Sequence, residues 1–289
     1  MNEDSIVYIN SEFVPLNQAK VSIMDRGFLY GDGIFETLRS YGGKIFKLQE
    51  HLDRMCRSAT ALQLQLPLPP GELVGIANAL LEKNNLQNAI LRITLTRGVG
   101  EHGILIDDHP PTLVIFARPV GRLEIDDSGV AIVLAPDGAS ALPGIAPGVK
   151  SCNFLPQILL RETARRKGAF EAIGLSDKGF LTEGSVCNIF LVKDGVLKTP
   201  ALNSLILPGI TRQTVIEIAD KEGIECLETS LTPESLYNAN EIFIVNTGWE
   251  IIPVAEVDGR KINSEVPGPV SELIKSAYRK IVEALNDPC

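Results

Sequence analysis

The chain has 289 residues, 45% of them hydrophobic and 22% charged, which predicts one large or two medium-sized globular domains. The formal net charge of −9 argues against nucleic acid as the main partner, because nucleic-acid-binding domains usually carry a basic face. The five cysteines form no CxxC pair, the N-terminus has no signal-peptide core and no apolar run approaches the ~18 residues of a membrane span, so we expect no disulfide framework, no zinc site, no membrane segment and a cytoplasmic location.

The N-terminal part of the chain alternates short strands with turns. Residues 6–14 predict a hairpin, and residues 21–24 predict a short strand. In residues 25–37 three glycines interleave with aromatic and charged side chains, so we expect a loop whose backbone comes close to a ligand. This loop leads into a second hairpin, which turns at Gly42 and Gly43.

Two helices are predicted next. Residues 48–63 carry apolar side chains at helical spacing on one face, and residues 72–83 form a second helical segment. His51 and Arg54 lie off the apolar face of the first helix. We expect His51 to be a partly buried structural residue, whereas an arginine such as Arg54 would by itself most often be a solvated helix charge.

Two strands are predicted at residues 89–97 and 111–117. Between them, residues 98–103 match the GxGxxG pattern of dinucleotide-binding proteins. Because two prolines rather than a helix follow this match, we reject a dinucleotide site and predict a loop. Residues 119–129 are polar and rich in turn formers, which indicates a linker.

The strands and helices follow no regular βαβ order, which predicts an α+β protein. We place a small N-terminal domain at residues 1–118, a linker at 119–129 and a larger C-terminal domain at 130–289. In the C-terminal domain the patterns predict strands at residues 130–135, 172–176, 242–245 and 254–257, and helices at 155–167, after the segment 207–212, and at 269–285.

Three features of the C-terminal domain point to a cofactor. Lys150 stands in the segment VKSCN ahead of a predicted helix, and Glu183 lies just before a predicted hairpin at residues 186–199. The segment LPGITR places Gly209 and Thr211 at a helix start, where unpaired N–H groups bind anions. A pyridoxal phosphate enzyme needs a lysine that forms a Schiff base, a carboxylate that keeps the pyridine nitrogen protonated, and a site for the phosphate.

At this point the chain resembles the class IV, or fold type IV, pyridoxal-phosphate aminotransferases, which have a two-domain α+β fold. This family includes D-amino-acid aminotransferases, branched-chain aminotransferases and aminodeoxychorismate lyases. The resemblance covers nearly the whole chain and rests on six motifs in order, of which any one alone would be weak. The motifs are RGFLYGDGIFET (26–37), EHLDR (50–54), VKSCN (149–153), LTEGSVCNIF (181–190), LPGITR (207–212) and NTGWEIIP (246–253).

The resemblance implies which residues hold the ring of the cofactor. Lys150 matches the lysine that forms the Schiff base and carries the proton between the substrate Cα and the cofactor C4′. Glu183 matches the partner of the pyridine nitrogen, and Leu207 matches the residue packed on the ring face.

The resemblance also implies a phosphate site and a quaternary structure. Ile210 and Thr211 match the turn that binds the phosphate, Thr247 matches a second phosphate contact, and Arg54 matches their cationic partner. Family members are dimers whose active site takes a loop from the neighbouring subunit, so we expect a homodimer.

Six residues are candidates for substrate binding. If the backbone turn at Thr247 and Gly248 binds the α-carboxylate, L-amino acids are favoured. If instead a cationic cluster of Arg92, His102 and Arg26 from the neighbouring subunit binds it, D-amino acids are favoured, since arginine suits a carboxylate. The full set of candidates is Arg26, Tyr30, Phe35, Arg92, His102 and Gly248.

Two positions weigh against a branched-chain enzyme, because Ile90 and Phe154 stand where such enzymes commonly carry tyrosine. We therefore favour transamination between a D-amino acid and a 2-oxo acid such as 2-oxoglutarate or pyruvate. A branched-chain L-amino-acid aminotransferase and an aminodeoxychorismate lyase remain alternatives. A non-catalytic binding protein with the same fold is a further alternative, against which the intact Lys150 and Glu183 argue.

Overall fold

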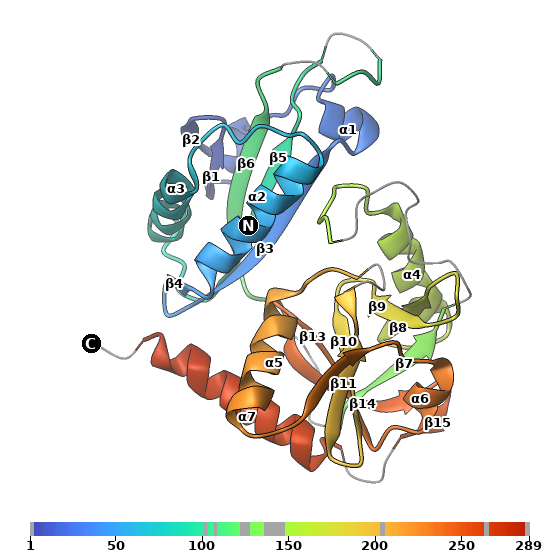
Figure 1. The fold of residues 1–289 in the computed structure, drawn as a ribbon. Coiled ribbons are helices and arrows are strands. Elements are labelled where there is room, and N and C mark those ends of the chain that lie inside the picture. Colours follow the sequence, from blue (N-terminus) through green and yellow to red (C-terminus); the bar gives the residue numbers. More distant parts are fainter. Residues whose placement is uncertain are drawn as a thin grey trace. The chain divides into compact units, whose positions relative to one another are not determined.

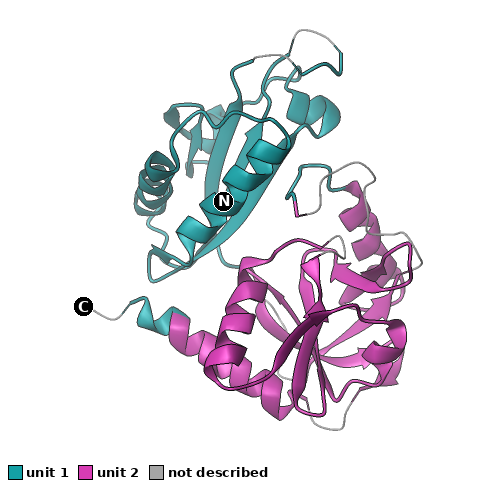
Figure 2. Cartoon of the chain, viewed as in Figure 1, with its two compact units in different colours: residues 1–121, 149–154, 282–289 teal, residues 122–148, 155–281 magenta. Residues whose placement is uncertain are grey.

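A computed structural model describes residues 3–100, 103–106, 109–121, 128–135, 148–202, 206–262 and 266–286 of the chain. The chain divides into two compact units (Figure 2). Unit 1 comprises residues 1–121, 149–154 and 282–289, and unit 2 comprises residues 122–148 and 155–281. The predicted linker at residues 119–129 remains a prediction. Residues 149–154, which include Lys150, belong to unit 1 although they follow a segment of unit 2.

Unit 1 is built on an antiparallel sheet, which has six strands within the described residues, in the order β2-β1-β6-β5-β3-β4 (Figure 1). Helices α2 and α3 pack on one face of it, where Leu38 and Leu91 of the sheet share a buried apolar cluster with Leu52 and Leu80 of the helices. The elements of this unit are β1 (Ile6–Ile9), β2 (Glu12–Pro15), η1 (Leu16–Gln18), α1 (Arg26–Tyr30), β3 (Gly33–Tyr41), β4 (Lys44–Ile45), α2 (Leu48–Ala61), α3 (Pro70–Lys83), β5 (Ala89–Thr96) and β6 (Thr112–Pro119).

Most of the predicted N-terminal elements are confirmed. The hairpin β1–β2, the hairpin that turns at Gly42 and Gly43, and the helix over residues 48–63 lie where the patterns placed them. The helix forms because Leu52, Met55 and Ala59 recur at helical spacing and are all buried.

The predicted strand at residues 21–24 is wrong, and so is the predicted loop over the first residues of the glycine-rich segment. Residues 22–25 form a turn instead, in which the Asp25 backbone N–H donates to the Ser22 carbonyl at 3.0 Å. Asp25 then caps the helix α1 by accepting from the Gly27 N–H, and Gly31 ends the helix with a φ of 69°. Local bonds from Ser and Asp compete with strand pairing, which explains the difference.

Unit 2 contains a mixed sheet, in which the described strands follow the order β12-β11-β10-β13-β14-β7-β8-β9, with β15 beside β14. The pairs β11–β12, β14–β7 and β7–β8 are parallel and the other pairs are antiparallel. Its elements are β7 (Val130–Leu134), α4 (Leu155–Arg166), β8 (Glu171–Leu175), β9 (Leu181–Gly184), β10 (Asn188–Lys193), β11 (Val196–Pro200), α5 (Ile210–Lys221), β12 (Cys226–Thr229), α6 (Pro233–Tyr237), β13 (Glu241–Asn246), β14 (Glu250–Val257), β15 (Arg260–Lys261) and α7 (Pro269–Ala284).

The predicted elements of unit 2 are confirmed in kind, and three short ones had no prediction. Strand β12, helix α6 and strand β15 are each two to five residues long, too short for a periodic pattern. Helix α6 does carry a local signal, since Thr232 and Ser235 form a capping box ahead of it.

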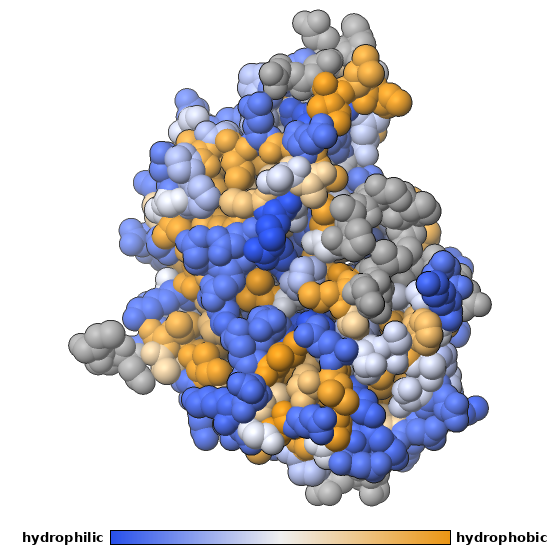
Figure 3. All heavy atoms as spheres, viewed as in Figure 1, coloured by the Kyte–Doolittle hydropathy of each residue, from blue (hydrophilic) through white to orange (hydrophobic). Residues whose placement is uncertain are grey.

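Exposed apolar side chains gather at the α1 end of unit 1 (Figure 3). We call Ile23, Phe28, Ile104 and Leu105 the apolar patch; their exposed fractions are 74%, 74%, 82% and 72%. Among the described residues no helix has both the length and the apolar character that a membrane crossing requires.

Candidate active site

The segment that carries Lys150 pairs with the first residues of β3. The Phe35 N–H donates to the Lys150 carbonyl at 2.9 Å, and the Cys152 N–H donates to the Gly33 carbonyl at 2.8 Å. The half-buried Lys150 side chain places its Nζ 4.6 Å from the centroid of the Phe35 ring. Strand β3 therefore holds the backbone of the predicted cofactor lysine, and Phe35 of this strand contacts its side chain.

Arg92 lies against the same aromatic ring. Because Phe35 pairs with Thr94 and Thr37 pairs with Arg92, these side chains emerge on the sheet face opposite to helices α2 and α3. The Arg92 Cζ lies 3.7 Å from the Phe35 centroid, and its Nε donates to the Thr94 hydroxyl at 3.2 Å. Burial lowers the pKa of Arg92. The structure thus brings together three predicted residues, two of which are cations that can attract a carboxylate.

A buried ionic cluster lies on the other face of β3, and its central residue had no predicted role. Glu36 is 0% exposed and accepts from Arg54 Nε and Nη2, both at 2.7 Å, and from His51 Nδ1 at 2.8 Å. Burial alone would raise the pKa of Glu36, but Arg54 and His51 lower it to about 2. Burial also lowers the pKa of His51, which favours the neutral form of its ring.

Arg54 is therefore not a solvated helix charge, because its guanidinium is bound at both ends of one carboxylate inside the fold. The sequence prediction failed because the partner of Arg54 comes from another element: His51 and Arg54 of α2 both bind the Glu36 carboxylate of β3. His51 is more deeply buried than predicted, with an exposed fraction of 1%.

Two further candidates of unit 1, Arg26 and Tyr30, are the first and last residues of α1. Arg26 is buried, donates from Nε to Asp32 at 2.9 Å and from Nη1 to the Gly103 carbonyl at 2.8 Å, and lies 5.3 Å from the Tyr30 ring centroid. Tyr30 is 45% exposed. His102 lies outside the described residues. Their substrate contacts remain predictions.

In unit 2, Glu183 on β9 accepts two hydrogen bonds at one oxygen. The backbone N–H of Leu207 donates to Glu183 Oε2 at 3.0 Å, and Asn188 Nδ2 donates to the same atom at 3.1 Å. Asn188 Nδ2 also lies 3.1 Å from the Leu207 carbonyl, to which it donates. Two predicted residues, Glu183 and Leu207, are thus joined by an asparagine that had no predicted role.

The predicted phosphate site opens helix α5. Gly209 is the N-cap, and no side chain accepts a hydrogen bond from the first N–H groups of the helix. The first turn contains Ile210 and Thr211, both of which are buried. An uncapped helix start of this kind fits a phosphate group. Thr247 and Gly248 lie in the turn that joins β13 to β14.

A second buried carboxylate supports the strands near that turn. Glu171 is 0% exposed and accepts from the Ser185 hydroxyl at 2.9 Å and from Arg161 Nη1 at 3.1 Å. The guanidinium of Arg161 also lies 4.6 Å from the ring centroid of Phe170 and 5.2 Å from that of Trp249, which neighbours Gly248. Arg161 thus connects the buried Glu171 to the side chain of Trp249, which follows the turn at Thr247 and Gly248.

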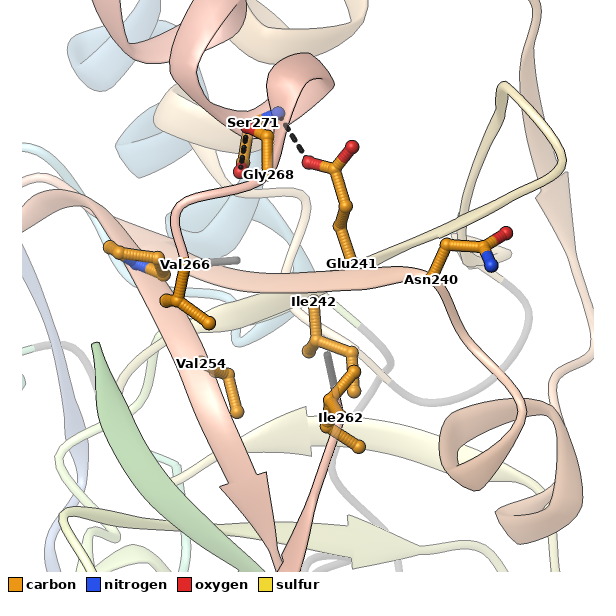
Figure 4. A pocket seen from close by; sticks show the side chains of 9 residues that line it. Asn240, Glu241, Ile242, Val254, Ile262, Val266, Gly268 and Ser271 are labelled. Carbon is orange, nitrogen blue, oxygen red and sulfur yellow. Dashed lines mark hydrogen bonds between the residues drawn. The ribbon is translucent and has the colours of Figure 1, made fainter. Parts of the chain in front are cut away.

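A small pocket in unit 2 lies elsewhere, and none of the predicted site residues lines it (Figure 4). Its wall includes Glu241, whose carboxylate accepts from the backbone N–H groups of Val270 at 3.0 Å and Ser271 at 2.7 Å. Glu241 thereby caps the start of α7, a structural role.

Comparison with known proteins gives consistent matches. The family model described as amino-transferase class IV matches residues 33–257. A protein of Methanocaldococcus jannaschii assigned as a branched-chain-amino-acid aminotransferase is 42% identical over 95% of this chain and 96% of its own. The D-alanine aminotransferase of Staphylococcus haemolyticus is 36% identical over 96% of this chain and 98% of its own.

Solved structures are similar over the same extent. The branched-chain aminotransferase of the thermophilic archaeon Thermoproteus uzoniensis, solved with norvaline, superposes with a TM-score of 0.91 at 33% identity, covering 98% of this chain and 96% of that one. Another branched-chain amino acid aminotransferase, solved with pyridoxamine 5′-phosphate, superposes with the same TM-score of 0.91 at 29% identity, covering 99% of this chain and 96% of that one.

Proposed function

This chain belongs to the class IV aminotransferase family, which depends on pyridoxal phosphate, and we propose that it is a transaminase that moves an amino group between an amino acid and a 2-oxo acid. The family and its cofactor are those that the sequence motifs predicted. The α+β fold of type IV is likewise confirmed.

One observation carries the proposal of a reaction centre at Lys150: this lysine and Arg92 contact the same Phe35 ring. When bound, the cofactor supplies an electron sink for negative charge at the substrate α-carbon. Lys150 is proposed to hold the cofactor covalently and then, as a free amine, to take and return the proton of that carbon. Arg92 is proposed to orient a substrate carboxylate beside it.

The other cofactor contacts are proposed from the fit of the residues. Glu183 is proposed to keep the pyridine nitrogen protonated, and Leu207, whose backbone it binds, to pack on the ring. The uncapped start of α5 supports phosphate binding by the first turn of that helix. The proposed phosphate ligands are Ile210, Thr211, Thr247 and Arg54.

Two substrate classes have specific support. D-amino acids are favoured by the position of Arg92, which contacts the same Phe35 ring as Lys150. They are also favoured by Ile90 and Phe154, which stand where branched-chain enzymes commonly carry tyrosine. In this proposal His102 and Arg26 of the neighbouring subunit join Arg92, and Tyr30 and Phe35 line the substrate. Branched-chain L-amino acids are favoured by the archaeal relative, with the backbone at Gly248 as the carboxylate site.

The half-reaction of the purified enzyme with each enantiomer of alanine, glutamate and leucine, followed by cofactor absorbance, separates these classes. Faster bleaching by D-substrates is the expected result. Faster bleaching by L-leucine than by any D-amino acid would establish the branched-chain alternative. Release of pyruvate from an aminated chorismate without added 2-oxo acid would instead indicate a lyase.

We also propose a homodimer, with a second copy covering the apolar patch. Patches of this kind on a soluble chain usually mark an interface. Light scattering should give twice the chain mass, and Phe28→Asp should shift the protein towards monomer. The control Leu227→Asp changes a residue of unit 2 that is 41% exposed and should leave the dimer intact. A wild-type monomer at micromolar concentration would contradict the proposal. A cytoplasmic location stays a prediction.

A further inference from the structure

We propose that Asn188 is a positioning residue for the cofactor: its side-chain amide holds the Glu183 carboxylate at the orientation that meets the pyridine nitrogen. This inference rests on the proposed role of Glu183 and deepens it. Asn188 begins β10, and Glu183 lies on β9.

The amide of Asn188 connects two groups that are proposed to touch the cofactor ring. Its Nδ2 lies 3.1 Å from Glu183 Oε2 and 3.1 Å from the Leu207 carbonyl oxygen, so each of its two hydrogens has an acceptor. The Leu207 N–H completes the arrangement by donating to the same Glu183 oxygen at 3.0 Å. The carboxylate, the amide and the Leu207 peptide thus form one closed set of bonds, which fixes the carboxylate plane.

Gly209 leaves room for the amide of Asn188, because it has no Cβ. A Cβ built on Gly209 would lie 2.1 Å from Asn188 Oδ1, well inside the closest contact that atoms tolerate. The Gly209 backbone has φ −64° and ψ 136°, which any residue adopts, so the conformation itself does not require glycine. Glycine is needed here because the asparagine amide occupies the space of a side chain.

The donors of this set are uncharged, and that suits the proposed role. A cationic donor orients a carboxylate and also offsets its charge, whereas an amide N–H such as those of Asn188 and Leu207 orients the carboxylate and offsets less of its charge. Asn188→Asp retains the shape of the side chain but replaces the donor by an acceptor with a negative charge, so it should disturb Glu183 more than Asn188→Ala does.

The double-mutant cycle of Asn188→Ala and Gly209→Ala tests the geometry. Gly209→Ala alone should weaken cofactor retention, because its methyl group displaces the amide. In the Asn188→Ala background the same change should have little further effect, since the obstructing oxygen is gone. Additive effects of the two changes on the cofactor dissociation constant would show that the two residues act independently and would overturn the proposal.

The decisive readout is the protonation of the cofactor nitrogen in the holoenzyme. Enzyme loaded with pyridoxal phosphate labelled with ¹⁵N at the pyridine nitrogen is titrated by NMR for the wild type, Glu183→Gln and Asn188→Ala. Asn240→Ala serves as the control, because this asparagine of the same unit accepts from the Asp194 N–H, which follows the end of β10 opposite to Asn188. We expect the nitrogen of Asn188→Ala to lose its proton about one pH unit below the wild type. We also expect kcat to fall roughly tenfold, as for one lost hydrogen bond to a charged group, with KM little changed.

The outcomes separate this inference from the proposed function. If Glu183→Gln loses the proton and Asn188→Ala titrates like the wild type and the control, Glu183 has its role and the inference about Asn188 is wrong. If Glu183→Gln itself titrates like the wild type, the role of Glu183 falls and the inference falls with it. Gly209→Ala, measured in the same way, gives the same decision if Asn188→Ala does not fold.

Discussion

Two carboxylates, one in each unit, are bound in contrasting ways. Glu36 of unit 1 is completely buried and takes its hydrogen bonds from the cationic Arg54 and from His51. Glu183 of unit 2 is half-buried and takes its bonds from a side-chain amide and a backbone N–H. A carboxylate with a cationic donor has much of its charge offset inside the protein, while amide donors mainly set its direction.

The difference suggests a division of labour. Glu36 stabilises unit 1 and orients Arg54, so its loss should be felt as a loss of stability. Glu183 is held in one orientation and is proposed to act on the cofactor, so its loss should lower the reaction rate.

The largest expected effect is on stability. Glu36→Gln keeps the shape of the side chain but leaves the buried Arg54 guanidinium without its counter-charge, so the free energy of unfolding should fall by roughly 3–5 kcal/mol. Urea denaturation measures this change. Glu162→Gln is the matched control, because Glu162 pairs with Arg165 and Arg166 on the exposed surface of α4 and its loss should leave the midpoint nearly unchanged. Equal midpoints for both variants would contradict the structural role of Glu36.

The converse effect is expected at Glu183. Glu183→Gln should slow the half-reaction with an amino acid roughly 10²–10³-fold, as when one preorganised electrostatic contact is removed, while the urea midpoint changes little. Stopped-flow absorbance gives the rate. A half-reaction as fast as that of the wild type would refute the role of Glu183.

The buried cluster also predicts acid sensitivity. The pKa of Glu36 is lowered from its ordinary 4.5 to about 2, so this group contributes stability above pH 4.5 that is lost as the pH falls towards 2; the full contribution is roughly 3 kcal/mol. The pKa of His51 is lowered from 6.5 by burial, so the unfolded chain takes up this proton first and stability starts to fall below pH 6.5. Urea midpoints should therefore decline from pH 7 to pH 4, and the decline below pH 4.5 should be smaller in Glu36→Gln. A flat profile in the wild type would be inconsistent with the buried cluster.

The smallest effect is expected for the loss of Arg54, which should weaken cofactor binding. Arg54→Ala should weaken binding of pyridoxal phosphate by about 1.5–3 kcal/mol if one charge-assisted contact to the phosphate is lost. Fluorescence titration of the apoprotein measures it, at a temperature where circular dichroism shows the variant folded. Arg57→Ala, an exposed arginine of the same helix, is the control. If the two variants bind pyridoxal phosphate equally well, Arg54 does not contact the phosphate and its role is limited to the ion pair with Glu36.

The sequence predicted those features that have a local pattern. The helix over residues 48–63 follows from the spacing of Leu52, Met55 and Ala59, and the roles proposed for Lys150 and Glu183 follow from motifs around them. In each case the information lies within a few neighbouring residues.

Features that depend on distant partners could not be predicted in this way. Nothing near Glu36 indicates that α2 will bring it an arginine, and nothing near Asn188 indicates that it will reach residues 183 and 207. Helix α1 was missed for a different reason: it has five residues, and only the cap at Asp25 and the terminator Gly31 mark it.

The central claim is that Lys150 holds the cofactor, and one measurement tests it directly. The holoenzyme is reduced with borohydride, digested, and the peptide that carries the cofactor is identified by mass. The expected result is a single adduct at Lys150, absent from a folded Lys150→Ala variant that also lacks activity. An adduct that maps to a different lysine of the wild-type enzyme would contradict the account.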